Sequence, residues 1–257
     1  MSNRYHSSMM SPWKRLDLKE VTLVLVSGIE KRKSLYALWR SGIGINFNST
    51  IFVTDMELET RIKGITIEST QGFVLDSIDA YSKYCVYHLG TKIKSKYALL
   101  VQADGYIIHR HKWNANFLQY DYIGSPWKLS DSAYIDPFGN HQRVGNGGFS
   151  LRSKRLLDIP NSSPVQWEVN KGEFYKHMNV GSQAEDGIIC VHNRHIYEAE
   201  GIQFAPLEIA LKFGFENRVD EYQGKLTFGY HKHFPKIWER ALDLFYRLIF
   251  LVRYPLL

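Results

Sequence analysis

The sequence predicts a single α/β domain with a mostly parallel central sheet flanked by helices. Three short apolar runs, at 21–26, 50–55 and 97–101, have the composition of buried strands, and the first of them is rich in β-branched residues. Patterns with helical spacing occupy 31–42 and 76–93 between them. Strands that alternate with helices favour a parallel sheet, because each helix carries the chain back to the start of the next strand.

The ends of the chain differ in pattern from this α/β core. Residues 1–19 are polar and show no period, so we expect a tail before a domain that spans 20–235. In 236–257, apolar residues recur at helical spacing between charged ones, which predicts an amphipathic terminal helix. Its apolar run is too short to span a bilayer, so the helix either lies in a membrane interface or packs on the core or on another subunit. The expected apolar face comprises Ile237, Ala241, Leu244, Leu248 and Val252.

The composition is that of a globular protein with a basic surface. Hydrophobic residues make up 44% of the 257 residues and charged residues 23%, and 32 Lys and Arg against 26 Asp and Glu give a net charge of +6. A positive surface attracts phosphate groups on nucleotides, nucleic acid or anionic lipid. Because the basic residues form only short clusters, without a long basic arm or zinc-finger spacing, we expect no nucleic-acid partner.

Two features of the sequence bear on location. Cys85 and Cys190 lie far apart and fit neither a disulfide framework nor a metal knuckle, which suits a reducing compartment. No apolar stretch precedes Val21, so we expect neither a signal peptide nor an amino-terminal membrane anchor. We therefore expect a cytoplasmic protein, either free or peripheral on the inner face of the membrane.

The first candidate site follows the third predicted strand, where an apolar run ends in Gln102, Ala103 and Asp104. Ligands of open α/β sheets bind at the carboxyl ends of strands, where an acidic side chain is placed to hold a metal-bound diphosphate. A lone Asp after a strand is also a common turn former or helix cap. Asp104 is therefore a candidate ligand with a structural alternative.

A second candidate is the segment 144–153, VGNGGFSLRS, which has three glycines within four residues. Glycine lets the backbone approach a ligand closely or adopt positive φ, although structural turns use it too. The abrupt change to Phe149, Ser150 and Leu151 indicates a rigid platform beneath a pocket, since a flexible linker would stay polar.

A third candidate is the acidic pair Glu185 and Asp186, which precedes the apolar segment 188–191. If that segment is helical, its dipole keeps the carboxylates ionised, as a general base requires. Acidic residues at a helix start are also commonly caps, so both interpretations stay open.

Histidines supply the fourth candidate. His231 and His233 share a face of an extended segment, and each ring is either a metal ligand or a buried hydrogen-bonding group. We interpret 109–112, with two more histidines, as a solvated basic loop that contacts phosphate.

Taken in order, these segments resemble a protein family catalogued as a domain of unknown function, number 5672, and regarded as glycosyltransferase-like. They are also similar in arrangement to inverting transferases of the GT-A fold, such as the β1,4- and β1,3-galactosyltransferase families. Those enzymes use a D-x-D motif, a Gly-Gly platform, a Glu-Asp pair and a late metal-binding His. The resemblance covers residues 20–234 and implies a GT-A-like, Rossmann-like domain. It is carried by LLVQADGYI, FLQYDYIGSPW, VGNGGFSLRS, EDGIIC, GIQFAPLEIALKFGFE and FGYHKHF.

The resemblance implies residues for the cation and the nucleotide. Asp104 matches the last Asp of D-x-D, which is a metal ligand, and His231 matches the late metal ligand. Gln102 replaces the first Asp, so it brings no charge but retains the ability to hydrogen-bond a ribose. Ser27 and Asp55, at the ends of the first two predicted strands, are placed to reach the nucleotide.

The resemblance also implies residues for the sugars. Asp186 matches the catalytic base, with Glu185 beside it holding an acceptor hydroxyl. Trp127, in a Gly-Ser-Pro-Trp turn, is expected to stack on the acceptor. The platform that faces both sugars is matched by Asn146, Gly147 and Gly148.

These assignments predict a metal-dependent inverting glycosyltransferase that uses Mn²⁺ or Mg²⁺. The donor is a nucleoside diphosphate sugar, by default a UDP-sugar, and the acceptor is a glycan or lipid-linked glycan made at the cytoplasmic membrane face. One alternative is a non-catalytic module that binds glycan or nucleotide on the same fold, which the loss of the first D-x-D carboxylate at Gln102 favours. Another is an adaptor for anionic lipid or nucleic acid, based on the +6 charge and the terminal helix.

Overall fold

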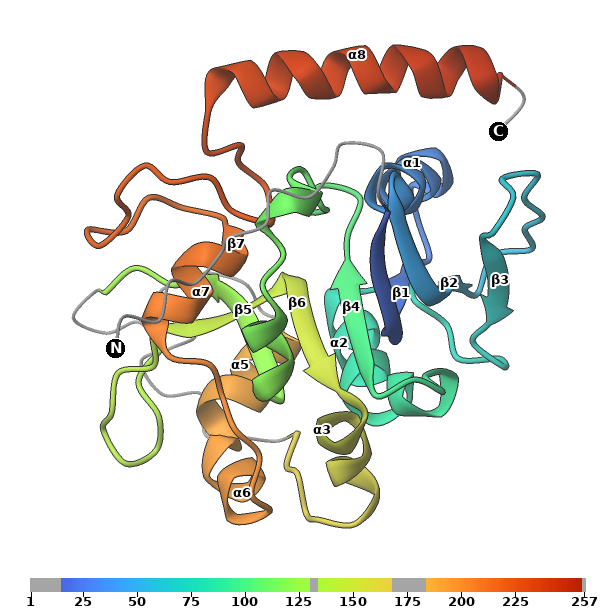
Figure 1. Cartoon of the computed structure of the whole chain (residues 1–257). Helices are drawn as coiled ribbons and strands as arrows, with labels where there is room; N and C mark the ends of the chain where they lie inside the picture. The colour runs from blue at the N-terminus through green and yellow to red at the C-terminus, as the bar shows by residue number, and fades with distance from the viewer. Residues whose placement is uncertain (1–14, 130–133, 168–183, 256–257) are drawn as a thin grey trace.

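The computed structural model describes residues 15–129, 134–167 and 184–255 and has a six-stranded central sheet (Figure 1). Its strands are β1 (Leu16–Val26), β2 (Ile45–Thr54), β3 (Thr66–Ser69), β4 (Tyr97–Val101), β5 (Tyr122–Pro126) and β6 (Val144–Ser153). They lie in the order β3-β2-β1-β4-β6-β5. The first four in this order are parallel to one another, whereas β6 runs antiparallel to both β4 and β5. The predicted α/β class with a mostly parallel sheet is therefore confirmed.

Helices cover both faces of the sheet, and two short strands form a second, two-stranded sheet beside it (Figure 1). The two short strands are β7 (Gly214–Phe215) and β8 (Gly229–Tyr230). The α-helices are α1 (Lys31–Gly42), α2 (Ile78–Tyr87), α3 (Lys154–Asp158), α5 (Glu185–Gly187), α6 (Arg194–Ala199), α7 (Leu207–Phe213) and α8 (Ile237–Arg253). The other short helices are η1 (Leu89–Lys92), η2 (Arg110–Lys112), η3 (Ala115–Gln119), η4 (Ile159–Asn161) and η5 (Ile188–His192).

The first strand begins earlier than the sequence indicated. Leu16 and Leu18 are buried, alternate with exposed residues and pair with the start of β2. The expected tail of 1–19 is therefore too long, because 16–19 belong to β1, while 1–14 lie outside the described residues. Residues 16–19 alternate between buried and exposed positions, so they lack the continuous apolar run that identifies 21–26 as a strand.

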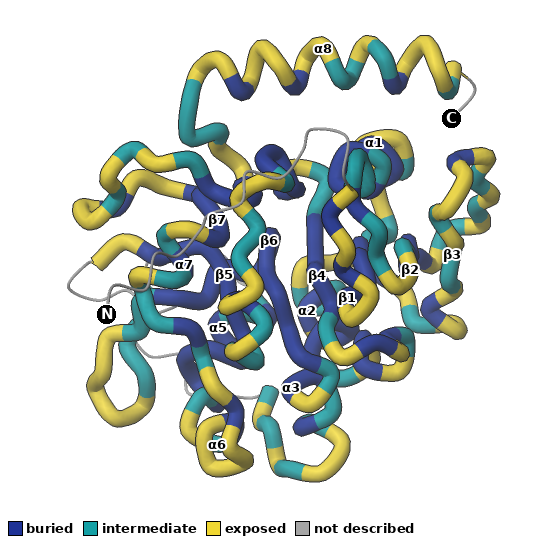
Figure 2. The backbone as a smooth tube through the Cα atoms, in the orientation of Figure 1, coloured by how far each residue is buried: buried dark blue, intermediate teal, exposed yellow. Residues whose placement is uncertain are grey.

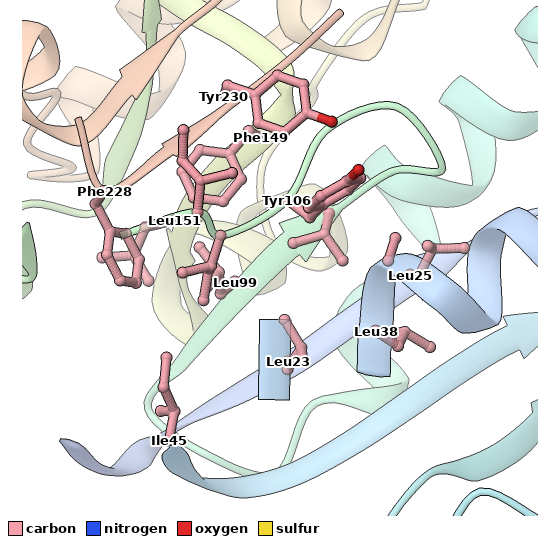
Figure 3. Packing of buried hydrophobic residues seen from close by; sticks show 14 of the residues in the cluster. Leu23, Leu25, Leu38, Ile45, Leu99, Tyr106, Phe149, Leu151, Phe228 and Tyr230 are labelled. Atoms are coloured by element: carbon pink, nitrogen blue, oxygen red, sulfur yellow. The ribbon is translucent and has the colours of Figure 1, made fainter. Parts of the chain in front are cut away.

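Both faces of the sheet are buried. In β1, Leu23 and Leu25 belong to the core cluster that includes Leu38 of α1, whereas Val24 and Val26 belong to the cluster on the α2 side. Figure 3 shows the first of these clusters, with Leu23, Leu25 and Leu38 packed together. Burial on both faces explains the uninterrupted apolar run, because each such side chain contributes about 1.5–3 kcal/mol when removed from water.

The terminal helix α8 lies over α1 and is attached largely by polar groups (Figure 1). Asp243 Oδ1 accepts hydrogen bonds from the hydroxyls of Tyr36, at 2.6 Å, and Tyr106, at 2.8 Å. Asp243 Oδ2 accepts a third from Arg247 Nε at 2.7 Å. Among the described residues, no helix is both long and apolar enough to cross a membrane.

We expect Asp243→Ala to lower the free energy of unfolding by roughly 2 kcal/mol, because two buried tyrosine hydroxyls lose the carboxylate oxygen that accepts from both. Tyr36 would keep only its longer hydrogen bond to the backbone oxygen of residue 243, at 3.2 Å. Urea unfolding followed by circular dichroism measures this. The adjacent Leu244→Ala is the control, because its side chain is exposed and its removal changes stability by less than about 0.5 kcal/mol. Equal effects of the two substitutions would show that Asp243 does not hold α8 in place.

Candidate functional site

The turn after β4 and the segment after β8 lie side by side and bring Asp104 next to His231. Tyr230 N donates to Tyr106 O at 3.2 Å, and Lys232 N donates to Asp104 O at 2.9 Å. These two backbone hydrogen bonds bracket His231, whose Nε2 lies 3.6 Å from Asp104 Oδ1. Residues 127 positions apart in the chain therefore share one site at the carboxyl end of β4.

Glu216 orients the imidazole of His231 from behind. His231 Nδ1 lies 3.2 Å from Glu216 Oε1, and His231 Nε2 lies 3.1 Å from Gln102 Oε1. Glu216 also contacts Lys232 Nζ at 3.0 Å and accepts a hydrogen bond from Asn146 Nδ2 at 2.8 Å. Burial by itself would raise the pKa of Glu216, but the hydrogen bond and charge of His231, together with Lys232, hold that pKa below its ordinary value. The carboxylate of Glu216 lies beside Nδ1, whereas Nε2 faces both Gln102 Oε1 and Asp104 Oδ1. A cation bound at Nε2 would displace its hydrogen bond to Gln102, and Glu216 would then take the place of the carboxylate in a carboxylate–histidine metal site.

Gly147 and Gly148 of β6 separate the two halves of the site, and both positions exclude a side chain. A Cβ on Gly148 would lie 2.2 Å from His231 Nε2, and a Cβ on Gly147 would lie 2.1 Å from Glu185 Oε1. Backbone and side chain are therefore in direct contact on both sides of this strand. The glycines are required by these contacts, since neither has the positive φ that a special turn would need.

Asp186, at the start of α5, lies against Gly147. Its Oδ2 accepts a hydrogen bond from Gly147 N at 2.9 Å, and its Oδ1 accepts one from Gly187 N at 2.8 Å. The pKa of Asp186 is raised to about 7, first by burial and then by the charges of Glu185 and Glu216, which outweigh the two backbone hydrogen bonds. A carboxyl group with such a pKa exchanges its proton near neutral pH, as a general base does.

Glu185 is engaged with an arginine in the interior. Its Oε1 accepts a hydrogen bond from Arg152 Nη2 at 2.8 Å, and both side chains are buried. Arg152 Nε also donates to Ser150 Oγ at 3.0 Å. Glu185 therefore fixes the start of α5 beneath Asp186, and the role of holding an acceptor hydroxyl stays a prediction.

A cavity of about 350 Å³ opens beside Asp104, at the carboxyl ends of β1 and β4 and the start of α2. Ser27, Gln102 and Asp104 line it together with apolar side chains that include Ile29. Gln102 Nε2 donates to the Tyr81 hydroxyl at 2.8 Å, which fixes the amide at the cavity wall. Three of the four residues expected to contact the nucleotide therefore border one cavity.

Asp55 is the fourth, and it does not line this cavity. Its Oδ2 accepts a hydrogen bond from Leu75 N at 2.8 Å and so fixes the loop before α2. Ser27 lines the cavity, but its hydroxyl donates to Ile29 O at 2.6 Å. Both side chains thus shape the cavity wall through the backbone of neighbouring loops.

Trp127 is covered in this structure. The residue is only 3% exposed, and its ring stacks on the ring of Tyr134 with centroids 4.0 Å apart. A Cβ on Gly145 would lie 2.0 Å from the same ring, so the backbone of Gly145 also packs against it. The expected stacking of Trp127 on an acceptor does not fit this arrangement, because the surrounding residues take the contacts that a sugar would need.

His233 and His109 do not join the site. His233 is exposed, whereas His231 is buried against Glu216. His109 is also buried, and its Nε2 lies 2.7 Å from Glu239 Oε1 of α8. The interpretation of 109–112 as a fully solvated loop is therefore wrong at His109, which binds the terminal helix.

The pair Asp104 and His231 has the chemistry of a cation site. Its donor atoms are a carboxylate oxygen and an imidazole nitrogen. Mn²⁺ binds both kinds of ligand, whereas Mg²⁺ prefers the oxygen ligand. Among the described residues, no group of three or more His, Cys, Asp or Glu side chains is placed to hold a metal ion. A cation at this pair would take its remaining ligands from diphosphate oxygens and water, as divalent ions do in nucleotide sites.

Two important residues were missed by the sequence analysis. Glu216 lies in the quoted segment GIQFAPLEIALKFGFE, and a single acidic residue after an apolar stretch was the available signal. Arg152 lies at the end of the quoted segment VGNGGFSLRS, next to Lys154 and Arg155, and no local pattern distinguishes it from these two basic residues. Both are recognisable only through partners distant in the chain, Glu185 for Arg152 and His231 for Glu216.

Asp186 is expected to reduce the stability of the protein at neutral and alkaline pH. Because its pKa is raised to about 7, the protonated carboxyl contributes stability that is fully present below about pH 4 and is lost as the pH rises through about 7. Asp186→Asn cannot ionise, so its stability relative to the unsubstituted protein should rise by roughly 1–3 kcal/mol between pH 4.5 and pH 8. Urea unfolding at the two pH values measures the difference, and a constant difference would contradict the raised pKa.

Comparisons with known proteins agree with this fold. The structure of the galactosyltransferase LgtC in complex with donor and acceptor sugar analogs is similar at a TM-score of 0.50, with 14% identity, over 83% of this chain and 87% of that chain. An active-site mutant of LgtC gives a TM-score of 0.46 with 11% identity, over 82% of this chain and 86% of that chain. The first likeness identifies the α/β fold as GT-A-like, while no curated protein matches the sequence. Residues 64–231 match the model of DUF5672, described as a protein of unknown function, and the chain belongs to that family.

Proposed function

We propose that this protein is an inverting glycosyltransferase that moves a sugar from a nucleoside diphosphate sugar to a hydroxyl group, with Asp186 as general base. One observation carries the proposal. Asp186 binds the N–H of Gly147, and His231 of the Asp104–His231 pair lies against the adjacent Gly148, so the proposed base and the proposed cation site flank one short stretch of β6. A transferase needs these two functions close together, one for the attacking hydroxyl and one for the leaving diphosphate.

The donor is proposed to bind in the cavity beside Asp104. Its volume of about 350 Å³ and its partly apolar wall suit a nucleoside, while Asp104 at its edge suits the diphosphate. UDP is the default nucleotide. The structurally similar LgtC is a galactosyltransferase solved with a donor analog, which supports a nucleotide-sugar donor without naming its base.

Asp104 and His231 would hold Mn²⁺ or Mg²⁺ together with the diphosphate. When bound, the cation supplies positive charge that stabilises the leaving phosphate oxygens. Glu216 keeps the imidazole of His231 turned towards Asp104, and Lys232 balances the charge of Glu216. Gln102 contributes no charge, so Asp104 carries the anionic part of the site.

Asp186 acts on the acceptor in this proposal. It takes the proton of the acceptor hydroxyl as the hydroxyl oxygen forms its bond to the anomeric carbon and the bond from that carbon to the phosphate oxygen breaks. A single displacement of this kind inverts the anomeric carbon. The N–H groups of Gly147 and Gly187 fix both oxygens of the carboxylate, and Glu185 with Arg152 fixes the backbone beneath it.

A second candidate is a binding module on the same fold that captures a nucleotide or glycan without turnover. The observation that favours it is Gln102, which replaces a carboxylate of the D-x-D motif. Dependence of turnover on Asp186 separates the two proposals, since a binding module needs no general base.

We expect Asp186→Asn to lower the rate of UDP release from UDP-sugars in the presence of Mn²⁺ by roughly 10²–10⁴-fold, because the variant has no base. The affinity for UDP should change less than about threefold, since Asp186 does not line the donor cavity. In the unsubstituted protein the rate should rise with pH and level off above about pH 7, where the carboxylate is ionised.

The control is Asp158→Asn, which removes a carboxylate that pairs with Lys154 at the surface. This variant should retain the full rate and the same pH profile. Turnover by Asp186→Asn at the control rate would exclude Asp186 as the base. Tight UDP binding with no UDP release from any UDP-sugar, by either protein, would favour the binding module.

A further inference from the structure

The terminal helix α8 packs on the protein through its polar face, whereas an ordinary amphipathic helix buries its apolar face. Its acidic residues Glu239 and Asp243 are buried, whereas most of its large apolar residues face away from the protein. Figure 2 shows α8 as mostly exposed, with buried positions on the side that faces α1. The exposed apolar residues are Ile237, Trp238, Leu242, Leu244, Phe245, Leu248, Leu251 and Val252.

The orientation is fixed by specific contacts. Asp243 accepts hydrogen bonds from Tyr36 and Tyr106, and Glu239 pairs with His109. Phe250 is the buried apolar residue of the helix and packs against the ring of Tyr36 with centroids 5.4 Å apart. Rotating α8 to bury its apolar stripe would break all of these contacts.

The outward face, defined as the exposed apolar residues named above, is large and continuous along the helix. Exposure reaches 94% for Ile237, 62% for Leu248 and 83% for Val252, at the start, the middle and the end of α8. All five residues that the sequence assigned to one apolar face, including these three, are exposed. An apolar surface of this kind on a folded protein marks an interaction site.

The charges around the outward face are basic. Arg240 and Arg253 are exposed on α8, and both acidic residues of the helix are turned inward. Arg32 and Lys33 of α1 line a small cavity with Arg247 and Leu251, at the carboxyl-terminal half of α8. Lys33 pairs with Glu30, and Arg247 pairs with Asp243. The cationic margin of the outward face therefore comes from Arg32, Arg240 and Arg253, and it complements an anionic surface.

This charge pattern decides between two occupants. A second copy of the chain docked through the same face would bring Arg240 and Arg253 of both copies together, with no exposed acidic residue on α8 to neutralise them. A bilayer containing anionic phospholipid offers an apolar interior and negative headgroups at the depth that a helix lying in the interface requires. A bilayer of this kind complements both the apolar residues and the basic residues of the outward face. A second copy of the chain complements only the apolar residues.

We propose that the outward face of α8 docks on a membrane surface rich in anionic phospholipid. The helix would lie in the plane of the interface, because its bonds to Tyr36, Tyr106 and His109 keep it parallel to the protein surface. Asp243 bonds to Tyr106, which lies two residues after Asp104, and His231 lies six residues before Ile237. The docked helix is thus linked, through Tyr106 and the segment 232–236, to the two segments that carry Asp104 and His231.

The test is flotation of the full chain with vesicles of phosphatidylcholine and phosphatidylglycerol in equal parts, and with vesicles of phosphatidylcholine alone. The variant Leu244→Glu/Phe245→Glu places two carboxylates on the outward face, where both side chains are exposed and their replacement leaves the buried contacts of α8 in place. Phe138→Glu is the matched control, because Phe138 is equally apolar and 68% exposed but lies outside α8. Circular dichroism establishes that all three proteins are folded.

We expect the unsubstituted chain and Phe138→Glu to float with the anionic vesicles, and the double variant to bind at least tenfold less. Binding to neutral vesicles should be weaker, and Arg240→Ala should reduce binding to anionic vesicles roughly fivefold. Equal flotation of the double variant, or no flotation of the unsubstituted chain, would overturn the proposal. A dimer in solution that dissociates in the double variant, with no binding to vesicles, would assign the face to a second copy.

Discussion

The close contact of two glycines with the side chains on either side of them is the constraint on which the candidate site depends. At Gly147 and Gly148 the backbone of β6 occupies the space between Glu185 and His231, and a methyl group at either position would overlap them. Gly147 N then binds Asp186 directly. Because β6 is fixed in the sheet by its pairing with β4 and β5, the positions of Asp186 and His231 are fixed with it.

The arrangement accumulates negative charge in a partly buried space. Asp104, Asp186 and Glu216 meet near the platform, and Lys232 balances them only in part. The raised pKa of Asp186 is one consequence, because burial and two carboxylate neighbours oppose its ionisation. A bound cation would relieve this repulsion, which is a physical reason for the site to favour a metal complex of an anionic ligand.

Much of the fold could be predicted from the sequence, because strands buried on both faces leave continuous apolar runs such as 21–26 and 97–101. The half-buried start of β1 leaves only an alternation of Leu16 and Leu18, which is too short to recognise. Of the site, Asp104, Asp186 and His231 were found through their motifs, and the structure brings them to one platform.

The features that sequence reasoning missed or misplaced depend on long-range packing. Glu216 acquires its place only when β7 pairs with β8, and Trp127 loses its exposed face only when Tyr134 stacks on it. The apolar face of α8 was predicted, but its direction was not. Direction depends on whether Asp243 finds buried donors, and these come from Tyr36 and Tyr106 far back in the chain.

The central claim is that Asp104 and His231 share one cation together with a nucleoside diphosphate. Calorimetric titration of UDP in Mn²⁺ into the unsubstituted chain, Asp104→Ala, His231→Ala and the double variant tests it directly. If the cation is shared, each single variant loses most of the Mn²⁺-dependent affinity and the double variant loses little more, so that the coupling exceeds about 1 kcal/mol. Unchanged affinity in the single variants, or losses that add to within about 0.5 kcal/mol, would contradict a common site.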